Sequence, residues 1–131
     1  MAQTITKSSM DYVKQALAAA PAISVEEALA LVDCPEHVFV DLRDGDEQAK
    51  SGVIAGAVSS SRGMIEFHID PKCPAHKPEF NQKKTYVFYC ASGGRSAMAA
   101  LVAMEMGLSP VLNLAGGVSA WKKAGGTLEP A

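Results

Sequence analysis

One short segment of the chain combines residue types that suit thiolate chemistry: Cys90, Ala91, Ser92, Gly93, Gly94, Arg95 and Ser96 follow one another. Small residues and two glycines allow successive backbone N–H groups to turn inward and form an anion-binding nest. A helix that begins behind this turn adds the partial positive charge of its N-terminus, and Arg95 adds a permanent cation. Such surroundings favour a thiolate over a thiol, whose ordinary pKa is about 8.5. We therefore predict that Cys90 is a nucleophile and that residues 91–96 form its binding loop.

The competing interpretation of Cys90 is purely structural, because cysteine is among the residue types most often buried in protein cores. Burial alone, however, gives no reason for a Gly-Gly-Arg-Ser sequence shortly after the cysteine. The loop sequence therefore favours the nucleophile over the core thiol.

The residues on either side of this segment predict the elements that position it. Residues 85–89 (TYVFY) are β-branched and aromatic, which predicts a strand that ends directly before Cys90. Residues 95–106 are apolar almost all round, which predicts a buried helix that stops at Gly107. Further strands are predicted at 38–40, 57–58 and 111–114, and further helices at 10–20, 24–32 and 44–52. Two more short helices are predicted to end at Phe67 and at Trp121.

Strands and helices alternate along the chain, and this order predicts an α/β fold with three layers, α/β/α, around a central parallel sheet. In such sheets ligands bind beyond the carboxyl ends of the strands, which is where Cys90 stands. Ahead of this unit, Met10, Val13, Ala16, Leu17 and Ala20 share one helical face, with Ser8 and Ser9 as candidate caps. We predict an N-terminal helical extension over residues 1–21 and a second unit over residues 22–131.

Four segments together resemble the rhodanese-like domain family. Residues 90–95 resemble its C-x-x-G-x-R active-site loop, and residues 38–43 (VFVDLR) resemble its strand ending in V-D-x-R. Residues 52–57 (GVIAGA) resemble its G-H-I-x-G-A element, and residues 114–121 its late G-G-x-x-x-W segment. The four occur in the family's order and span nearly the whole chain apart from the N-terminal helix. One departure is Val53, which stands where many members carry histidine.

The resemblance implies a rhodanese-like domain that acts as a sulfurtransferase. Cys90 would take sulfane sulfur from thiosulfate or a persulfide donor, hold it as a persulfide, and pass it to a thiol or to cyanide. The amides of residues 91–96 would stabilise the persulfide, and no cofactor or metal is implied. The physiological donor and acceptor stay open at this level.

Two other functions are compatible with parts of the pattern. Cysteine phosphatases use a C-x5-R loop to surround a tetrahedral oxyanion, whereas only four residues separate Cys90 from Arg95 here. A non-enzymatic rhodanese-like module that carries sulfur or binds a partner would usually lack the cysteine. The N-terminal helix is the best argument for a partner, because it could pack on the domain, swap into a homodimer or dock on an acceptor protein.

The arginines suggest two roles at the predicted site. Arg43, Arg62 and Arg95 each follow a predicted strand, so they are expected around Cys90 as a cationic mouth that selects anionic donors. Alternatively, Arg43 pairs with a nearby carboxylate and braces the loop. We expect Asp41 to be such a bracing carboxylate rather than a general base.

The remaining cysteines and the overall charge limit the other function classes. Cys73 and His76 have a metal-like spacing, but two ligands do not make a site, and the sequence cannot say whether Cys73 cooperates with Cys90. Three cysteines at irregular spacing predict no disulfide framework and a reduced, cytoplasmic setting. The net charge of −2 predicts neither nucleic-acid nor anionic-membrane binding. The polar N-terminus predicts no signal peptide.

Overall fold

A five-stranded, entirely parallel sheet forms the centre of the computed structural model, which describes residues 2–131. The strand order is β1-β5-β4-β2-β3, which confirms the parallel sheet expected from the alternation of strands and helices. The strands are β1 (Ala22–Ile23), β2 (His37–Asp41), β3 (Val58–Ser59), β4 (Thr85–Tyr89) and β5 (Val111–Leu114).

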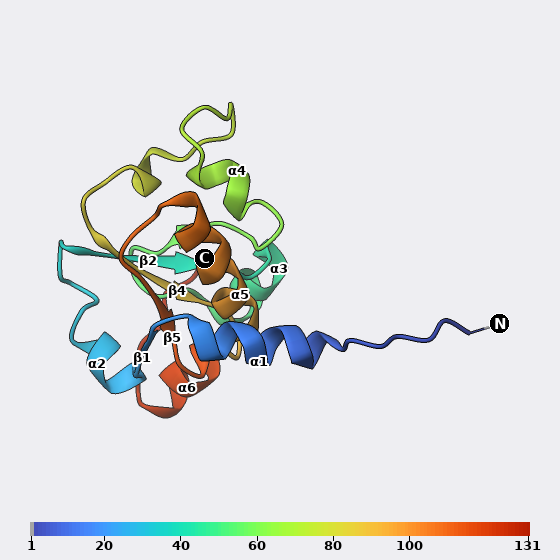
Figure 1. The fold of residues 1–131 in the computed structure, drawn as a ribbon. Coiled ribbons are helices and arrows are strands. Elements are labelled where there is room, and N and C mark those ends of the chain that lie inside the picture. Colours follow the sequence, from blue (N-terminus) through green and yellow to red (C-terminus); the bar gives the residue numbers. More distant parts are fainter. Residues whose placement is uncertain (1) are drawn as a thin grey trace.

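Helices cover both faces of the sheet, so the predicted three-layer α/β/α architecture is confirmed (Figure 1). The helices are α1 (Ser9–Ala19), α2 (Val25–Leu29), α3 (Gly45–Ser51), α4 (Ile65–Ile69), α5 (Gly94–Met106) and α6 (Gly117–Lys123), with a 3-10 turn at Pro78–Phe80. Helices α1, α4 and α5 contribute to the core on one face, and α2 and α6 contribute to the core on the other.

Strand β4 divides its side chains between the two cores because successive residues of a strand point to opposite faces. Tyr86 and Phe88 lie in the core beneath α5, whereas Val87 and Tyr89 lie in the core beneath α6. All four are fully buried. The strand is therefore held on both sides, which fixes the position of the residue that follows it.

Helix α1 packs on α5 through a narrower face than the sequence predicts. Ser8 caps it in a capping box with Asp11. Ala16 and Ala20 are buried, whereas Met10 and Leu17 are 54% and 50% exposed. The buried residues of this segment are thus alanines, and four alanines of α5 belong to the same core.

Two elements differ from the sequence-based expectation for local reasons. Helix α2 ends at Leu29, short of the predicted Val32, and irregular turns follow. Strand β1 was not expected, since two residues carry no legible periodicity. Its existence depends on pairing with β5, where Ile23 lies opposite Leu114. Among residues 2–131, no helix is long and apolar enough to cross a membrane.

Candidate active site

Cys90 is the first residue after β4, and its sulfur is surrounded by hydrogen-bond donors. Its side chain is only 1% exposed. The backbone N–H of Gly93 lies 3.1 Å from the sulfur, and the backbone N–H of Ser96 lies 3.4 Å from it. The hydroxyl oxygen of Ser96 is also 3.4 Å away. The loop thus forms a nest of donors around one buried sulfur atom.

These donors reverse the effect that burial has on the thiol. Burial by itself raises the pKa of Cys90, because a charge is poorly solvated in the protein interior. The Ser96 hydroxyl and the amides of Ser96, Gly93 and Ser92 outweigh that effect, and the net pKa is lowered from the ordinary value. The site therefore favours a thiolate although it excludes water.

The loop reaches this geometry through Gly93. Its φ of 101° lies in the left-handed region that favours glycine. It is the N-cap of α5, so the first turn of that helix begins directly beside the sulfur. Helix α5 has 13 residues, long enough for its dipole to favour negative charge at this end.

The first turn of α6 holds the same loop from the other side. The amides of Val118 and Ser119 donate to the carbonyls of Cys90 and Ala91, at 2.9 and 3.1 Å. A Cβ on Gly117 would lie 2.5 Å from the Cys90 carbonyl oxygen, so only glycine allows this approach. Because the carbonyls are held by α6, the amides of the loop are left to face the sulfur.

A buried asparagine on β5 joins this network, and sequence reasoning missed it. Asn113 is 2% exposed. Its amide nitrogen lies 3.1 Å from the Gly93 carbonyl oxygen, and its carbonyl oxygen lies 2.6 Å from the Ser96 hydroxyl. The signal was present in the sequence, since a lone amide within the buried strand VLNL needs a polar partner.

Arg95 fastens the loop to α3. Its guanidinium makes two hydrogen bonds to the Glu47 carboxylate, at 2.8 and 2.7 Å. These bonds, together with the backbone N–H of Asp44, lower the pKa of Glu47 to about 2, and the pKa of Arg95 is raised. Both side chains are more than a third exposed, so the pair lies at the rim of the site.

The two expected roles for Arg43 are distinguished by its contacts. Arg43 is 2% exposed, and its guanidinium bonds both oxygens of Asp41, at 3.0 and 2.7 Å. It also donates to the Gly52 carbonyl oxygen, at 2.7 Å. Its charge is neutralised within the protein, which is the geometry that the bracing interpretation describes for Arg43 and Asp41.

Arg62 and Cys73 lie apart from these contacts. Arg62 pairs with Glu66 at 3.3 Å and lines a cavity with Tyr12 and Met98, not the one that reaches Ala91. The structure therefore does not gather the three arginines into a cationic mouth. Cys73 lies in the loop after α4, where its sulfur accepts from the Ala75 amide at 3.4 Å.

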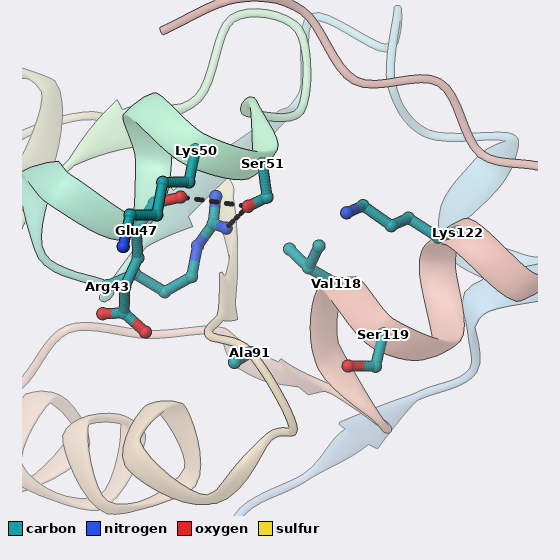
Figure 2. Close-up of a pocket in the computed structure, with 8 residues that line it drawn as sticks. All are labelled: Arg43, Glu47, Lys50, Ser51, Ala91, Val118, Ser119 and Lys122. Atoms are coloured by element: carbon teal, nitrogen blue, oxygen red, sulfur yellow. Dashed lines mark hydrogen bonds between the residues drawn. The ribbon is translucent and has the colours of Figure 1, made fainter.

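A cavity of about 290 Å³ opens beside the loop, between α3 and α6 (Figure 2). Ala91 and Val118 form part of its wall, and Lys122 points into it from α6. Lys50 also lines it. Within residues 2–131 neither lysine has an ion-pair partner, but only the Lys122 ammonium faces the cavity, because the Lys50 side chain points away from α6 (Figure 2). Over the same residues, no group of three or more His, Cys, Asp or Glu could hold a metal ion.

Comparison with known proteins places the chain in a family. The sequence model of the rhodanese-like domain matches residues 24–124. A sulfurtransferase of Allochromatium vinosum is 34% identical over 95 residues, which cover 72% of this chain and 80% of that protein. The thiosulfate sulfurtransferase GlpE of Pseudoalteromonas translucida is 30% identical over 102 residues, covering 78% of this chain and 89% of that protein.

Solved structures share the fold of this chain. A protein of unknown function from Rhodopseudomonas palustris, described as a possible tyrosine phosphatase, superimposes with a TM-score of 0.93 at 44% identity. The superposition covers 98% of this chain and 99% of that protein's chain. The human single-domain sulfurtransferase superimposes with a TM-score of 0.66 at 25% identity, covering 79% of this chain and 96% of its own. With a family model that spans most of its length and an α/β/α fold built around a cysteine loop, this chain belongs to the rhodanese-like domain family.

Proposed function

We propose that this protein is a sulfurtransferase that carries sulfane sulfur on Cys90. The observation that carries the proposal is the set of hydrogen-bond donors around the Cys90 sulfur, which lowers the pKa of a thiol that burial alone would raise. Such a centre suits two successive anions in the same place, a thiolate and then a persulfide.

The reaction would proceed in two displacement steps. In the first, the Cys90 thiolate attacks the outer sulfur of thiosulfate, the sulfur–sulfur bond of thiosulfate breaks, and sulfite leaves with the bonding electron pair. Cys90 then holds a persulfide anion inside the nest. In the second, cyanide carbon or a thiolate attacks the outer sulfur, and the Cys90 thiolate is released.

An anionic donor fits the charges around the cavity beside the loop. At this cavity Arg43 is paired with Asp41, and Glu47 is paired with Arg95. Lys122 points into the cavity and has no ion-pair partner in the described part of the chain. The unpaired positive charge of Lys122 supports thiosulfate or another small anion as donor. A thiol acceptor in the cell and a cytoplasmic location are part of the same proposal.

A phosphatase is the alternative, because the similar Rhodopseudomonas palustris protein is described as a possible tyrosine phosphatase. Two observations oppose it for this chain. The loop has four residues between Cys90 and Arg95, one fewer than a cysteine phosphatase loop. In addition, both terminal nitrogens of Arg95 bond Glu47, so this arginine is not free to surround a phosphate.

The decisive experiment is the intact mass of the reduced protein after incubation with thiosulfate. We expect the parent to gain one sulfur atom and to lose it again when cyanide is added. Cys90→Ser should gain nothing, whereas Cys73→Ser, which removes a thiol outside the loop, should behave like the parent.

A gain of mass that persists in Cys90→Ser would overturn the assignment of the site. Absence of any adduct with thiosulfate and with a persulfide donor, while p-nitrophenyl phosphate is hydrolysed in a Cys90-dependent way, would establish the phosphatase instead. If neither activity is found, the non-enzymatic module is the correct description.

A further inference from the structure

The single proton of the Ser96 hydroxyl has two acceptors within reach. One is the Cys90 sulfur at 3.4 Å, and the other is the side-chain oxygen of Asn113 at 2.6 Å. All three side chains are at least 98% buried, so bulk solvent does not reach them. A hydroxyl has one donor proton, and it cannot serve both acceptors fully at once.

The orientation of Asn113 follows from its other contact. The Gly93 carbonyl oxygen can only accept, so the amide group of Asn113 must face it, at 3.1 Å. The oxygen of the same side chain must then face Ser96, and it too can only accept. Ser96 therefore donates to Asn113 while Cys90 is a neutral thiol, and the thiol proton is free to point at the Ser96 oxygen.

Ionisation of Cys90 changes this arrangement. A thiolate has no proton and needs donors, so the Ser96 hydroxyl gains by turning toward the sulfur. That rotation leaves the Asn113 oxygen without a donor in a buried site, where an unpaired polar atom is unfavourable. In the structure described for residues 2–131, every buried side-chain nitrogen and oxygen has a partner within hydrogen-bond distance, and for the Asn113 oxygen that partner is the Ser96 hydroxyl.

We propose that Asn113 is a positioning residue that competes with Cys90 for the Ser96 hydroxyl proton and so limits how strongly Ser96 stabilises the thiolate. The proposal deepens the proposed function and rests on it in one respect, since it requires Cys90 chemistry to begin from a thiolate. The Cys90 thiolate is then stabilised by backbone amides but not fully by the Ser96 hydroxyl. A less stabilised thiolate is a stronger nucleophile.

Charged groups around the loop do not provide the same effect. From α5 and α3 the pair Arg95–Glu47 faces the loop, and from the β2 end the pair Asp41–Arg43 does. Tyr89 precedes Cys90 on β4, with its hydroxyl accepting from the Ile54 amide. Within residues 2–131, none of these groups hydrogen-bonds Ser96 or Asn113, so their influence on Cys90 stays constant when Asn113 is changed.

The test is the titration of the Cys90 thiolate by its ultraviolet absorbance in a Cys34→Ser, Cys73→Ser background, where Cys90 is the remaining thiol. Asn113→Ala frees the Ser96 hydroxyl, and we expect the titration midpoint to fall by roughly half to one pH unit. Ser96→Ala should raise the midpoint. In the Ser96→Ala background, Asn113→Ala should leave the midpoint unchanged.

This double-mutant cycle separates the effect of Asn113 on the Ser96 proton from its support of the loop. Asn113→Ala removes the contact with the Gly93 carbonyl in both backgrounds, whereas it frees the hydroxyl only where Ser96 is present. An equal shift in both backgrounds, or an upward shift with Ser96 present, would overturn the proposal. Asn113→Val fills more of the space, so it provides a second variant if Asn113→Ala melts below the parent, and the same downward shift is expected.

The outcome is independent of sulfur transfer because the titration needs no donor. A parent that forms no persulfide but shows the predicted cycle refutes the proposed function and supports the role of Asn113. A parent that forms the persulfide but whose midpoint is insensitive to Asn113 supports the function and refutes that role.

Discussion

At the scale of single residues, the site depends on opposing contributions to the ionisation of one thiol. Burial of Cys90 to 1% exposure favours the neutral form, and the amides and hydroxyl around it favour the charged form. A hydrogen bond to a charged group contributes about 1.5–3 kcal/mol, so several such bonds outweigh the desolvation of one sulfur. The charge is thereby stabilised by neutral dipoles, whereas the arginines nearby are bound to carboxylates.

Lys122, which points into the cavity, is the residue expected to act on the donor itself. Lys122→Glu should raise the KM for thiosulfate by about five- to tenfold at low ionic strength, since one attractive charge becomes repulsive. The turnover number should change little. Lys123→Glu makes the same charge change one residue later, away from the cavity, and serves as the control. Steady-state kinetics with equal effects for both variants would show that only the overall charge matters.

At the scale of elements, three helices meet at the Cys90 loop and each holds a different part of it. Helix α5 begins where the loop ends, and α6 binds the carbonyls of the loop. Helix α3 holds Arg95 through Glu47. Among these, the contact between α3 and α5 joins residues 48 positions apart in the sequence. It is therefore a tertiary constraint on the loop, unlike the pair of Arg62 and Glu66 within one short segment.

The Glu47–Arg95 pair should make stability depend on pH in a defined window. Because the pKa of Glu47 is lowered to about 2 from an ordinary 4.5, the unfolded chain binds this proton first as the pH falls. The contribution is present above pH 4.5 and is lost between 4.5 and about 2. The pair is partly exposed, so Glu47→Gln should lower the unfolding free energy at pH 7 by less than about 1 kcal/mol.

Denaturant unfolding at several pH values checks this expectation. The difference between the parent and Glu47→Gln should shrink toward zero as the pH approaches 2. Glu66→Gln removes the same charge elsewhere and controls for net charge. A difference that stays constant over the whole range would mean that the ion pair does not stabilise the fold.

At the scale of the whole molecule, α1 is part of the packed structure on the α5 side. Ala16 and Ala20 belong to the core that also contains Cys90. A Cβ on Gly94 would lie 3.3 Å from the Val13 side chain, so α1 also lies against the start of the active-site loop. The chain ahead of α1 extends away from the body (Figure 1). This arrangement supports intramolecular packing among the roles considered for the N-terminal helix.

Removal of residues 2–21 should therefore destabilise the protein. Burial of Val13, Ala16 and Ala20 contributes about 2 kcal/mol, which in a domain of this size corresponds to a fall in Tm of about 5–10 °C. Removal of residues 2–7 keeps the Ser8 cap and should leave Tm unchanged. Light scattering on both proteins provides the companion measurement. A full-length mass twice that of the truncated chain would show instead that α1 joins two copies.

The sequence predicted most of the fold because its elements carry local signals. The residues TYVFY coincide with β4, and the stretch 111–114 coincides with β5. The capping box of Asp44 and Glu47 forms at the start of α3. The interface of α1 was less predictable, since Met10 and Leu17 follow the helical period and yet are about half exposed, whereas Ala16 and Ala20 are buried.

The sequence by itself determined which residues form the reactive loop, since Cys90, Gly93 and the start of α5 are neighbours and Gly93 supplies the left-handed backbone of the turn. Tertiary structure alone decided what surrounds it. Glu47 and Asn113 reach the loop from separate elements, Lys122 reaches the cavity beside it, and Arg95 meets its carboxylate only when α3 and α5 come together. Local sequence limits the backbone of each segment, whereas the partner of a side chain depends on which distant segments the sheet brings together.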